Sequence, residues 1–290
     1  MRDDRRDDRG FRGGDRRSDD RRDDRRGYDR RNFDQDQKPR YEKKEDADVI
    51  FGVRAVIEAI KAKREINKIM IQKGMNKELF NELKEALKGN DYNLQFVPIE
   101  KLNAITRQNH QGVVAYSSPV EYRNIEEIVD EKMEKGEKIC ILVLDRITDV
   151  RNFGGIARTA ECQGVDAILI PAKGSALVTS DAIKTSAGAL NRIPVCKTDD
   201  LKNSLFYLQQ SGIRLIACTE KAKSNLYETN LRGNIAVIMG SEENGITQDL
   251  INMSDIDTKI PMRGAIASLN VGVAAGMLLY EKTRQELYGI

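Results

Sequence analysis

The alternation of apolar runs with helical patterns after residue 138 constrains the fold of this chain more than any other feature. The run ICILVLD (139–145) is apolar up to its last residue, as is typical of a central strand in a parallel sheet whose two faces are both covered. Apolar residues at helical spacing follow in NFGGIARTAECQG, and strand and helix patterns alternate from there onwards. This order predicts an α/β fold with an open parallel sheet and helices on both faces.

Further elements are expected along the same stretch. The predicted strands are VDAILIP, IPVC, IRLIACT, IAVIMG and KIPM (259–262), and the predicted helices are SDAIKTSAGAL (180–190) and LKNSLFYLQQSG. The last helix lies in IPMRGAIASLNVGVAAGMLLYE (260–281), with Ser268 as its N-cap and Asn270 in its first turn.

A second, smaller α/β unit is expected over residues 47–119. Its predicted strands lie near Ile50–Val53, in INKIMIQ (66–72), in YNLQFVP and in QGVVAYSSP, and a predicted amphipathic helix covers 76–89. IEKLNAIT is a short helix in this interpretation. A charged linker helix (120–138) then leads to the larger domain (139–290).

Residues 1–46 form a charged tail with 17 Lys plus Arg and 15 Asp plus Glu, a net charge of 17 − 15 = +2, and with almost no aliphatic residues. Such a segment cannot bury enough apolar surface to offset its loss of entropy, which predicts disorder. RGFRGG and RGYDRR resemble RNA-associating tails, but a solubility tail is the alternative. The whole chain also carries +2, so net charge neither supports nor excludes a nucleic-acid partner.

Composition argues against several classes of protein. The four cysteines form no CxxC pair and the single histidine is distant from them, so we expect free buried thiols and no metal site. The first residues contain no hydrophobic segment, so no signal peptide is expected. The uncharged run 265–280 is short for a membrane span, and we expect a cytoplasmic protein.

Three polar segments follow predicted strands, at the edge of the sheet where parallel α/β folds bind ligands. They are NFGGIARTAE with Asn152, Gly155 and Arg158, MGSEENGI with Gly240, Glu242 and Gly245, and the third with Ser268, Leu269 and Asn270. Each segment, considered by itself, also has a purely structural explanation. Arg158 could form a structural salt bridge, the segment after Gly240 could be an ordinary strand-end turn, and the third segment could hold a capping Ser268 and a buried, hydrogen-bonded Asn270. GxGxxG is absent, which disfavours a Rossmann-type oxidoreductase.

Together, in this order, the three segments resemble the signature motifs of the SpoU family, the TrmH-like RNA ribose 2′-O-methyltransferases of the SPOUT class. The resemblance covers 139–284. IFGVRAVIEAI and NHQGVVA are similar to the L30e-like RNA-binding domain of the RlmB branch, which modifies a guanosine of 23S rRNA. DRITDVRN departs from the family pattern, because Val150 and Arg151 stand where many members have Asp-Pro before the asparagine segment.

The resemblance implies S-adenosylmethionine as methyl donor, RNA as substrate, a homodimer, no metal, no membrane and a C-terminal trefoil knot. It places Arg158, Asn152, Glu242, Ser268 and Asn270 in catalysis, with Arg158 acting on the 2′-hydroxyl either as a base or electrostatically. The donor would be held at Gly240, Ile260, Met262, Ser268 and Leu269. His110 and Arg151 are candidate RNA contacts, although a turn role explains His110 equally well. A tRNA methyltransferase and a catalytically silent RNA-binding or ribosome-assembly factor are the alternatives.

Overall fold

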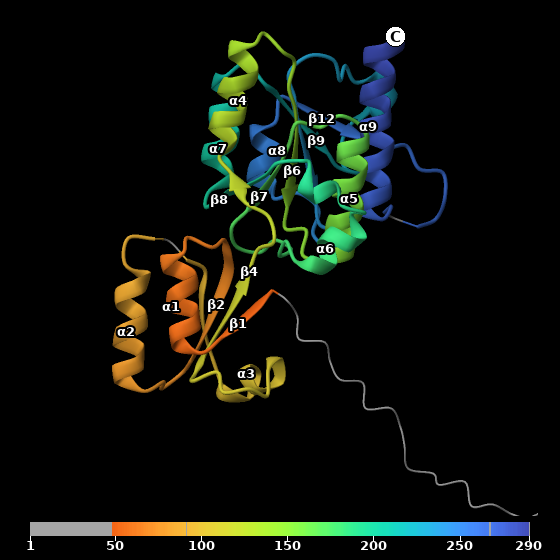
Figure 1. The fold of residues 1–290 in the computed structure, drawn as a ribbon. Helices are drawn as coiled ribbons and strands as arrows, with labels where there is room; N and C mark the ends of the chain where they lie inside the picture. Colours follow the sequence, from red (N-terminus) through yellow and green to blue (C-terminus); the bar gives the residue numbers. More distant parts are fainter. Residues whose placement is uncertain (1–47, 91, 267, 290) are drawn as a thin grey trace, which may run out of the picture. The chain divides into compact units, whose positions relative to one another are not determined.

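The first part of the chain forms a four-stranded sheet (Figure 1). The computed structural model describes residues 48–90, 92–266 and 268–289, so the predicted tail lies outside the described residues. In spatial order the strands are β1 (Val49–Phe51), β4 (Val113–Ser117), β2 (Ile66–Gln72) and β3 (Leu94–Val97). β4 is antiparallel to both neighbours, whereas β2 and β3 are parallel.

Helices pack on both faces of this sheet because successive strand residues point to opposite sides. The helices are α1 (Val53–Lys61), α2 (Lys77–Leu87) and α3 (Ile99–Ile105). Ile69 and Ile71 of β2 pack with residues of α1 and α2, among them the fully buried Leu83. Met70, between them in sequence, packs with Leu102 of α3 on the other face. The expected helix at 76–89 is confirmed as α2, with the Asn76 side chain as its N-cap.

The second sheet has eight strands, and every neighbouring pair in it is parallel. In spatial order the strands are β10 (Ser224–Asn225), β12 (Ile256–Lys259), β9 (Arg214–Cys218), β11 (Ile235–Gly240), β6 (Cys140–Asp145), β7 (Ala167–Pro171), β8 (Val195–Thr198) and β5 (Tyr122–Arg123). All six residues of β6 are buried, as the continuous apolar run predicted. The parallel α/β fold class is therefore confirmed.

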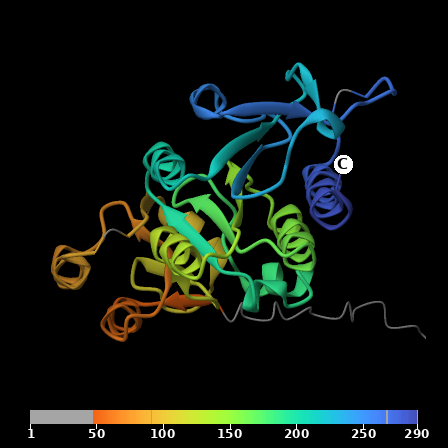
Figure 2. The ribbon, with the colours of Figure 1, turned by 90° about the horizontal axis from the view of Figure 1, so that it is seen from above.

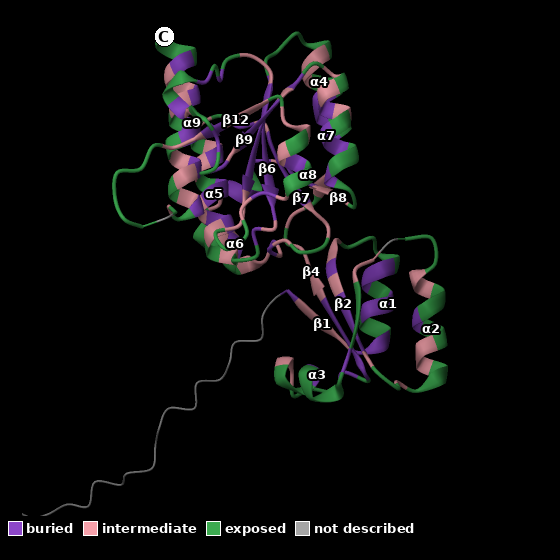
Figure 3. Ribbon diagram, turned by 180° about the vertical axis from the view of Figure 1, so that it is seen from behind, coloured by how far each residue is buried: buried purple, intermediate pink, exposed green. Residues whose placement is uncertain are grey.

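Helices cover both faces of the parallel sheet. One apolar core contains residues of α5 (Val150–Cys162), α6 (Ser180–Thr185) and α9 (Val271–Tyr288), and the other contains residues of α4 (Ile125–Glu134), α7 (Leu201–Gln210) and α8 (Gln248–Met253). Short 3₁₀ turns occupy Ala189–Asn191 and Leu226–Glu228. Figure 3 shows the buried strands between the half-exposed helices. Figure 2 shows α9, in dark blue, alongside α5.

Local patterns predicted most elements, but four boundaries were wrong. The first strand ends at Phe51, because Val53 already begins α1. β12 runs from Ile256 to Lys259, so the strand expected at 259–262 lies three residues earlier in the chain. The helix expected at 180–190 ends at Thr185, because Ala187 and Gly188 adopt left-handed backbone angles before the 3₁₀ turn. The last helix begins at Val271 rather than directly after Ser268. The predicted knot remains a prediction.

The four thiols are free, as expected, although not all of them are buried. Burial raises the pKa of Cys140, Cys196 and Cys218 to about 12 in each case. Cys162 is exposed, contrary to expectation, because it lies on the solvent side of the last turn of α5. Within the described ranges, no group of metal-ligating side chains occurs and no helix is both long and apolar enough to cross a bilayer.

Candidate active site

The ends of β6 and β11 lie next to each other at the carboxyl edge of the parallel sheet. The strands are in register over six residue pairs, and the last pair is Asp145 opposite Gly240. The polar segments 146–152 and 241–247 therefore leave the sheet at the same place. The third expected segment leads into α9, which packs against α5 (Figure 2).

The carboxylate of Glu242 joins all three segments. Its Oε1 atom accepts hydrogen bonds from Asn270 Nδ2 at 2.7 Å, from the Val271 backbone N–H at 3.1 Å and from Asn152 Nδ2 at 3.2 Å. Asn270 Nδ2 also donates to Asn152 Oδ1 at 3.0 Å. Asn152 and Asn270 are 118 residues apart in sequence, so the fold alone brings these polar groups together.

Asn270, not Ser268, is the N-cap of α9. Its Oδ1 atom accepts hydrogen bonds from the backbone N–H groups of Gly272 at 3.0 Å and Val273 at 3.3 Å. The expectation that Ser268 caps this helix was wrong, because the helix begins three residues after it. Asn270 is also exposed rather than buried, so the interpretation as a buried core asparagine was wrong as well.

The segment after β11 folds into a tight turn. The backbone N–H of Gly245 donates to the Ser241 carbonyl at 2.8 Å, and the two residues form an isolated β-bridge. A Cβ atom at Gly240 would overlap the Gly245 backbone, so only glycine fits at that position. Gly245 has a φ of +62°, which also favours glycine. The turn brings Glu242 back over the end of the strand.

Asp145 and Arg146 connect the end of β6 to this turn. Asp145 Oδ2 accepts hydrogen bonds from the Thr247 backbone N–H at 2.7 Å and from its hydroxyl at 2.6 Å. Arg146 Nη2 donates to the Gly245 carbonyl at 3.2 Å, and Arg146 Nε lies 3.3 Å from Asp145 Oδ1. Motif reasoning missed Arg146 and Thr247, and the one available signal was a carboxylate at the end of a buried strand.

A cavity of about 380 Å³ opens beside these groups. Arg146 is the only cationic residue among its lining residues, against three carboxylates. The lining residues are Arg146, Ile147, Thr148, Asp149, Asn152, Gly174, Ser241, Glu242, Glu243, Asn244 and Val271. Asp149 Oδ1 accepts a hydrogen bond from the Asn152 backbone N–H at 2.7 Å, which caps α5 and fixes the start of the helix that carries Asn152.

Arg158 lies two turns into α5 and is exposed. Among the described residues it has no hydrogen bond or ion pair, which contradicts its interpretation as half of a structural salt bridge. Arg151 is seven residues earlier, so both arginines project from the same face of the helix. Gly155 lies between them, and a Cβ built there meets nothing within 4 Å, so no described residue covers this position.

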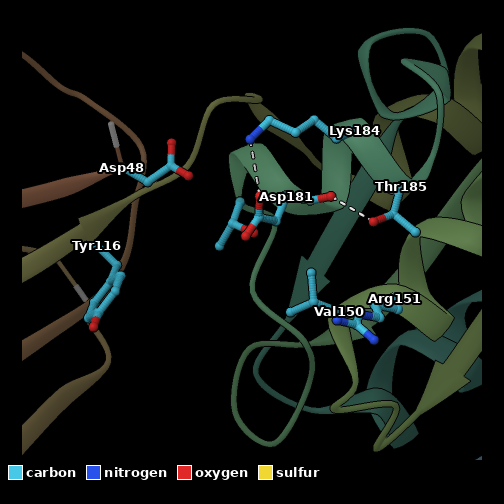
Figure 4. A pocket seen from close by; sticks show the side chains of 8 residues that line it. Asp48, Tyr116, Val150, Arg151, Asp181, Lys184 and Thr185 are labelled. Atoms are coloured by element: carbon cyan, nitrogen blue, oxygen red, sulfur yellow. Dashed lines mark hydrogen bonds and ion pairs between the residues drawn. The ribbon is translucent and has the colours of Figure 1, made fainter. Parts of the chain in front are cut away.

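Arg151 lines a second, larger cavity of about 570 Å³. Figure 4 shows Arg151 and Val150 at the start of α5, with Asp181, Lys184 and Thr185 of α6 nearby. The remaining lining residues are Asp48, Tyr116 and Thr179. The side chain of Lys184 forms an exposed ion pair with Asp181, and the Arg151 guanidinium makes no ion pair within the described ranges. Arg151 thus places at this cavity wall a guanidinium that forms no ion pair with the residues described by the structure.

The segment from Pro261 to Leu269 contains three predicted donor-binding residues, Met262, Ser268 and Leu269, and a fourth, Ile260, directly precedes it. It lies outside the strands and helices, and its described residues make no hydrogen bonds. Met262 is 41% exposed and Ile266 is 80% exposed, while Ile260 and Leu269 are half-buried. Ser268 is exposed in the same segment. Backbone polar groups and apolar side chains are therefore both available here to a ligand.

His110 lies in the turn before β4 and is 7% exposed. Its Nδ1 atom accepts a hydrogen bond from the Gly112 backbone N–H at 3.0 Å, and Nε2 lies 2.9 Å from Asn103 Oδ1. Both ring nitrogens are thus engaged within the chain. The geometry agrees with the turn interpretation, and nothing in it supports the alternative contact with RNA.

Two family models match this chain. The SpoU rRNA Methylase family matches residues 139–280, and the family described as RNA 2'-O ribose methyltransferase substrate binding matches residues 49–123. The first match covers every strand of the parallel sheet except β5, and the second covers the four-stranded sheet together with β5.

Similar proteins span nearly the same length. A putative TrmH family tRNA/rRNA methyltransferase of Staphylococcus epidermidis is 33% identical over 82% of this chain and 95% of its own length. One from Staphylococcus aureus is 36% identical, over 82% of this chain and 96% of its own length. The crystal structure of the SpoU methyltransferase AviRb from Streptomyces viridochromogenes, solved in complex with AdoMet, has a TM-score of 0.54 at 19% identity, covering 83% of this chain and 91% of that one. This last similarity concerns the fold.

Proposed function

This chain belongs to the SpoU rRNA methylase family, and we propose that it transfers a methyl group from S-adenosylmethionine to a ribose 2′-hydroxyl of RNA. The observation that carries the proposal is the hydrogen-bonded group of Asn152, Glu242 and Asn270. Each of these residues comes from a different strand-end segment. The group stands at the wall of a cavity that is open to a substrate.

The donor fits the segments around this group. S-adenosylmethionine, when bound, supplies an activated methyl group on a sulfonium. The unpaired backbone and apolar side chains between Pro261 and Leu269 suit an adenine ring and a ribose. We assign Gly240, Ile260, Met262, Ser268 and Leu269 to donor binding, because they belong to two segments that meet at Glu242.

Arg158 is the residue we assign to the 2′-hydroxyl. A free guanidinium is too basic to accept a proton near neutral pH, but it can orient a hydroxyl and an adjacent phosphate with two parallel hydrogen bonds. Exposure and the lack of an ion partner among the described residues leave its donors available for this task. Asn152, Glu242, Ser268 and Asn270 complete the polar surroundings in this proposal. Holding the hydroxyl in line with the methyl carbon then supplies much of the rate.

We propose that different parts of the chain have different functions. Residues 47–119 bind RNA, residues 139–290 carry out methyl transfer, and residues 120–138 link these two domains. Arg151 is proposed as an RNA contact at the cavity shown in Figure 4. The match of residues 49–123 to a substrate-binding family supports the first assignment. A homodimer is part of the proposal, and so is a location in the cytoplasm.

A guanosine of 23S rRNA is the proposed target nucleotide. The separate N-terminal unit supports rRNA, because it resembles an RNA-binding domain of the branch that modifies this molecule. The similar proteins of Staphylococcus carry the name tRNA/rRNA methyltransferase, so tRNA is the second candidate.

The test is methyl transfer from labelled S-adenosylmethionine to deproteinised 23S rRNA and to tRNA, followed by mapping of the modified nucleotide. Arg158→Ala is expected to lower the rate by about 100-fold or more, because the hydroxyl loses its orienting group. Arg192→Ala is the matched control, since Arg192 is also an exposed arginine of this half of the chain. Calorimetry with S-adenosylmethionine checks that both variants still bind the donor.

The outcomes separate the candidates. Label in a ribose of 23S rRNA supports the proposal, and label in tRNA alone replaces rRNA by tRNA as the substrate. Donor binding without transfer to either RNA would identify a catalytically silent RNA-binding factor. A loss in Arg192→Ala equal to that in Arg158→Ala would contradict the role given to Arg158.

A further inference from the structure

Arg146 stands at the edge of the proposed site in an unusual backbone conformation. Its φ of +59° lies in the left-handed region, which residues other than glycine, asparagine and aspartate seldom adopt. Such conformations persist where the surrounding structure enforces them, and they cluster at functional sites. The side chain of Arg146, in this conformation, contacts Asp145 and Gly245.

The guanidinium of Arg146 contacts the last residue of β6 and the turn that follows β11. Nε lies 3.3 Å from Oδ1 of Asp145, whose side chain is only 5% exposed. Nη2 donates to the carbonyl oxygen of Gly245 at 3.2 Å, across 99 residues of sequence. A buried carboxylate requires a compensating charge, and Arg146 is the one cation that forms an ion pair with Asp145 among the described residues.

The Gly245 carbonyl belongs to the turn that carries Glu242. Inside this turn the hydrogen bonds run from the N–H groups of Gly245 and Asn244 to Ser241, so they shape the turn without tying it to β6. The hydrogen bonds that connect the turn to the end of β6 are those from Arg146 to the Gly245 carbonyl and from Thr247 to the Asp145 carboxylate. Two consecutive residues of one strand end thus hold the far side of the turn at two points.

We propose that Arg146 is a positioning residue: held by Asp145, its guanidinium fixes the turn from Ser241 to Gly245 and thereby places the Glu242 carboxylate between Asn152 and Asn270. The proposal rests on the proposed methyl transfer for its consequence in catalysis. The consequence follows because a single oxygen of Glu242 accepts hydrogen bonds from three donors, and such a group tolerates displacements of only about 0.5 Å.

Arg146→Gly is the informative variant. Glycine adopts a positive φ freely, so the variant removes the guanidinium without imposing backbone strain. Lys63→Gly is the matched control, because Lys63 is an exposed cation with a φ of +51° that forms no side-chain ion pair among the described residues. Both variants replace a left-handed basic residue with glycine, and only one of them contacts the turn.

Three measurements on the full-length protein test the proposal. Hydrogen exchange of the backbone amides in 241–247 and at Val271 is expected to accelerate in Arg146→Gly and to be unchanged in Lys63→Gly. The kcat for methyl transfer is expected to fall about tenfold or more, while the Kd for S-adenosylmethionine changes by no more than about threefold. Guanidinium ion, at concentrations well below those that denature the protein, is expected to restore part of the lost rate in Arg146→Gly, because this variant leaves the place of the guanidinium empty.

A double-mutant cycle with Glu242→Gln tests whether Arg146 acts through Glu242. Removal of Arg146 is expected to cost little further rate once Glu242 is replaced, because its effect passes through that carboxylate. Fully multiplicative losses would overturn the proposal, and so would unchanged exchange of 241–247 in Arg146→Gly. If the wild type transfers no methyl group, the proposed function fails, while the exchange measurement still decides whether Arg146 holds the turn.

Discussion

At the scale of single residues, Lys197 on β8 shows how burial changes the pKa of a lysine. Its Nζ atom donates to Asn67 Oδ1 at 2.9 Å and lies 3.6 Å from the centre of the Tyr122 ring. Burial lowers the pKa of Lys197 to about 8, and the carboxylate of Glu65 opposes this shift. The lysine is therefore held in its charged form at neutral pH against a desolvation penalty.

This pKa predicts a pH-dependent stability. Between pH 8 and the ordinary lysine pKa of 10.5, the unfolded chain binds more protons at Lys197 than the folded chain does, so the free energy of unfolding rises with pH in that window. Lys197→Met removes the effect. We expect the stability difference between wild type and this variant to shift in favour of the wild type as pH rises, by up to about 1.4 kcal/mol for each pKa unit.

Urea denaturation of both proteins at pH 7, 8, 9 and 10 measures the difference. Lys63→Met controls for the loss of one positive charge, because Lys63 is exposed. A difference between wild type and Lys197→Met that stays constant from pH 7 to 10 would show that Lys197 is not desolvated in the folded state.

At the scale of elements, Gly240 at the end of β11 leaves no room for a side chain, whereas Gly155 in α5 does. A Cβ at Gly240 would overlap the Gly245 backbone. The turn cannot move away from the end of the strand without loss of hydrogen bonds such as the one from the Gly245 N–H to the Ser241 carbonyl. Gly155 lies in the middle of α5, where a Cβ meets nothing within 4 Å. Gly154, next to it, is in close contact with α6, since a Cβ there would lie 2.8 Å from the Thr185 side chain.

Alanine substitutions at the two sites are expected to act in opposite directions. Gly240→Ala is expected to destabilise the protein by about 2 kcal/mol or more through steric overlap, and to weaken the binding of S-adenosylmethionine. Gly155→Ala is expected to stabilise it by about 0.5–1 kcal/mol, because alanine is the better helix former. Thermal unfolding and calorimetry measure both effects. Equal stability of the two variants would be inconsistent with the tight turn at Gly240.

At the scale of the whole molecule, α9 presents an apolar stripe to solvent. Val273, Met277 and Tyr280 are 54%, 44% and 62% exposed and recur at helical spacing. The GxxxG glycines of the same helix, by contrast, face α5 within the chain: Cβ atoms built at Gly272 and Gly276 would lie 3.9 Å from Ile156 and 3.7 Å from Thr159. The stripe, rather than the glycines, is therefore the candidate surface for the proposed homodimer.

The dimer makes a direct prediction. Wild-type protein is expected to show twice the chain mass in light scattering, and Val273→Glu with Met277→Glu is expected to yield a folded monomer, because buried charge in an apolar interface is costly. Phe206→Glu is the matched control, since Phe206 on α7 is 58% exposed and far from the stripe in sequence. A wild-type monomer at micromolar concentration would exclude the proposed assembly.

The elements of the fold were predictable wherever the pattern is local. The apolar run of β6 and the spacing of α2 depend on neighbours a few residues apart, so periodicity identified both. The N-cap of α9 was not predictable, because Ser268 and Asn270 are both good capping residues. In the structure Asn270 caps the helix and also donates a hydrogen bond to Glu242. Glu242 is distant in sequence, so no local pattern shows this contact.

The same distinction holds for the site. The residue types of the three motifs, and their positions after predicted strands, could be read from the amino-acid order, because a parallel sheet gathers its strand ends at one edge. The pairing of Glu242 with Asn152 and Asn270 agrees with that expectation. The tie from Arg146 to Gly245 was decided by tertiary structure alone, because an arginine after a strand has no local pattern that points to a carbonyl 99 residues away.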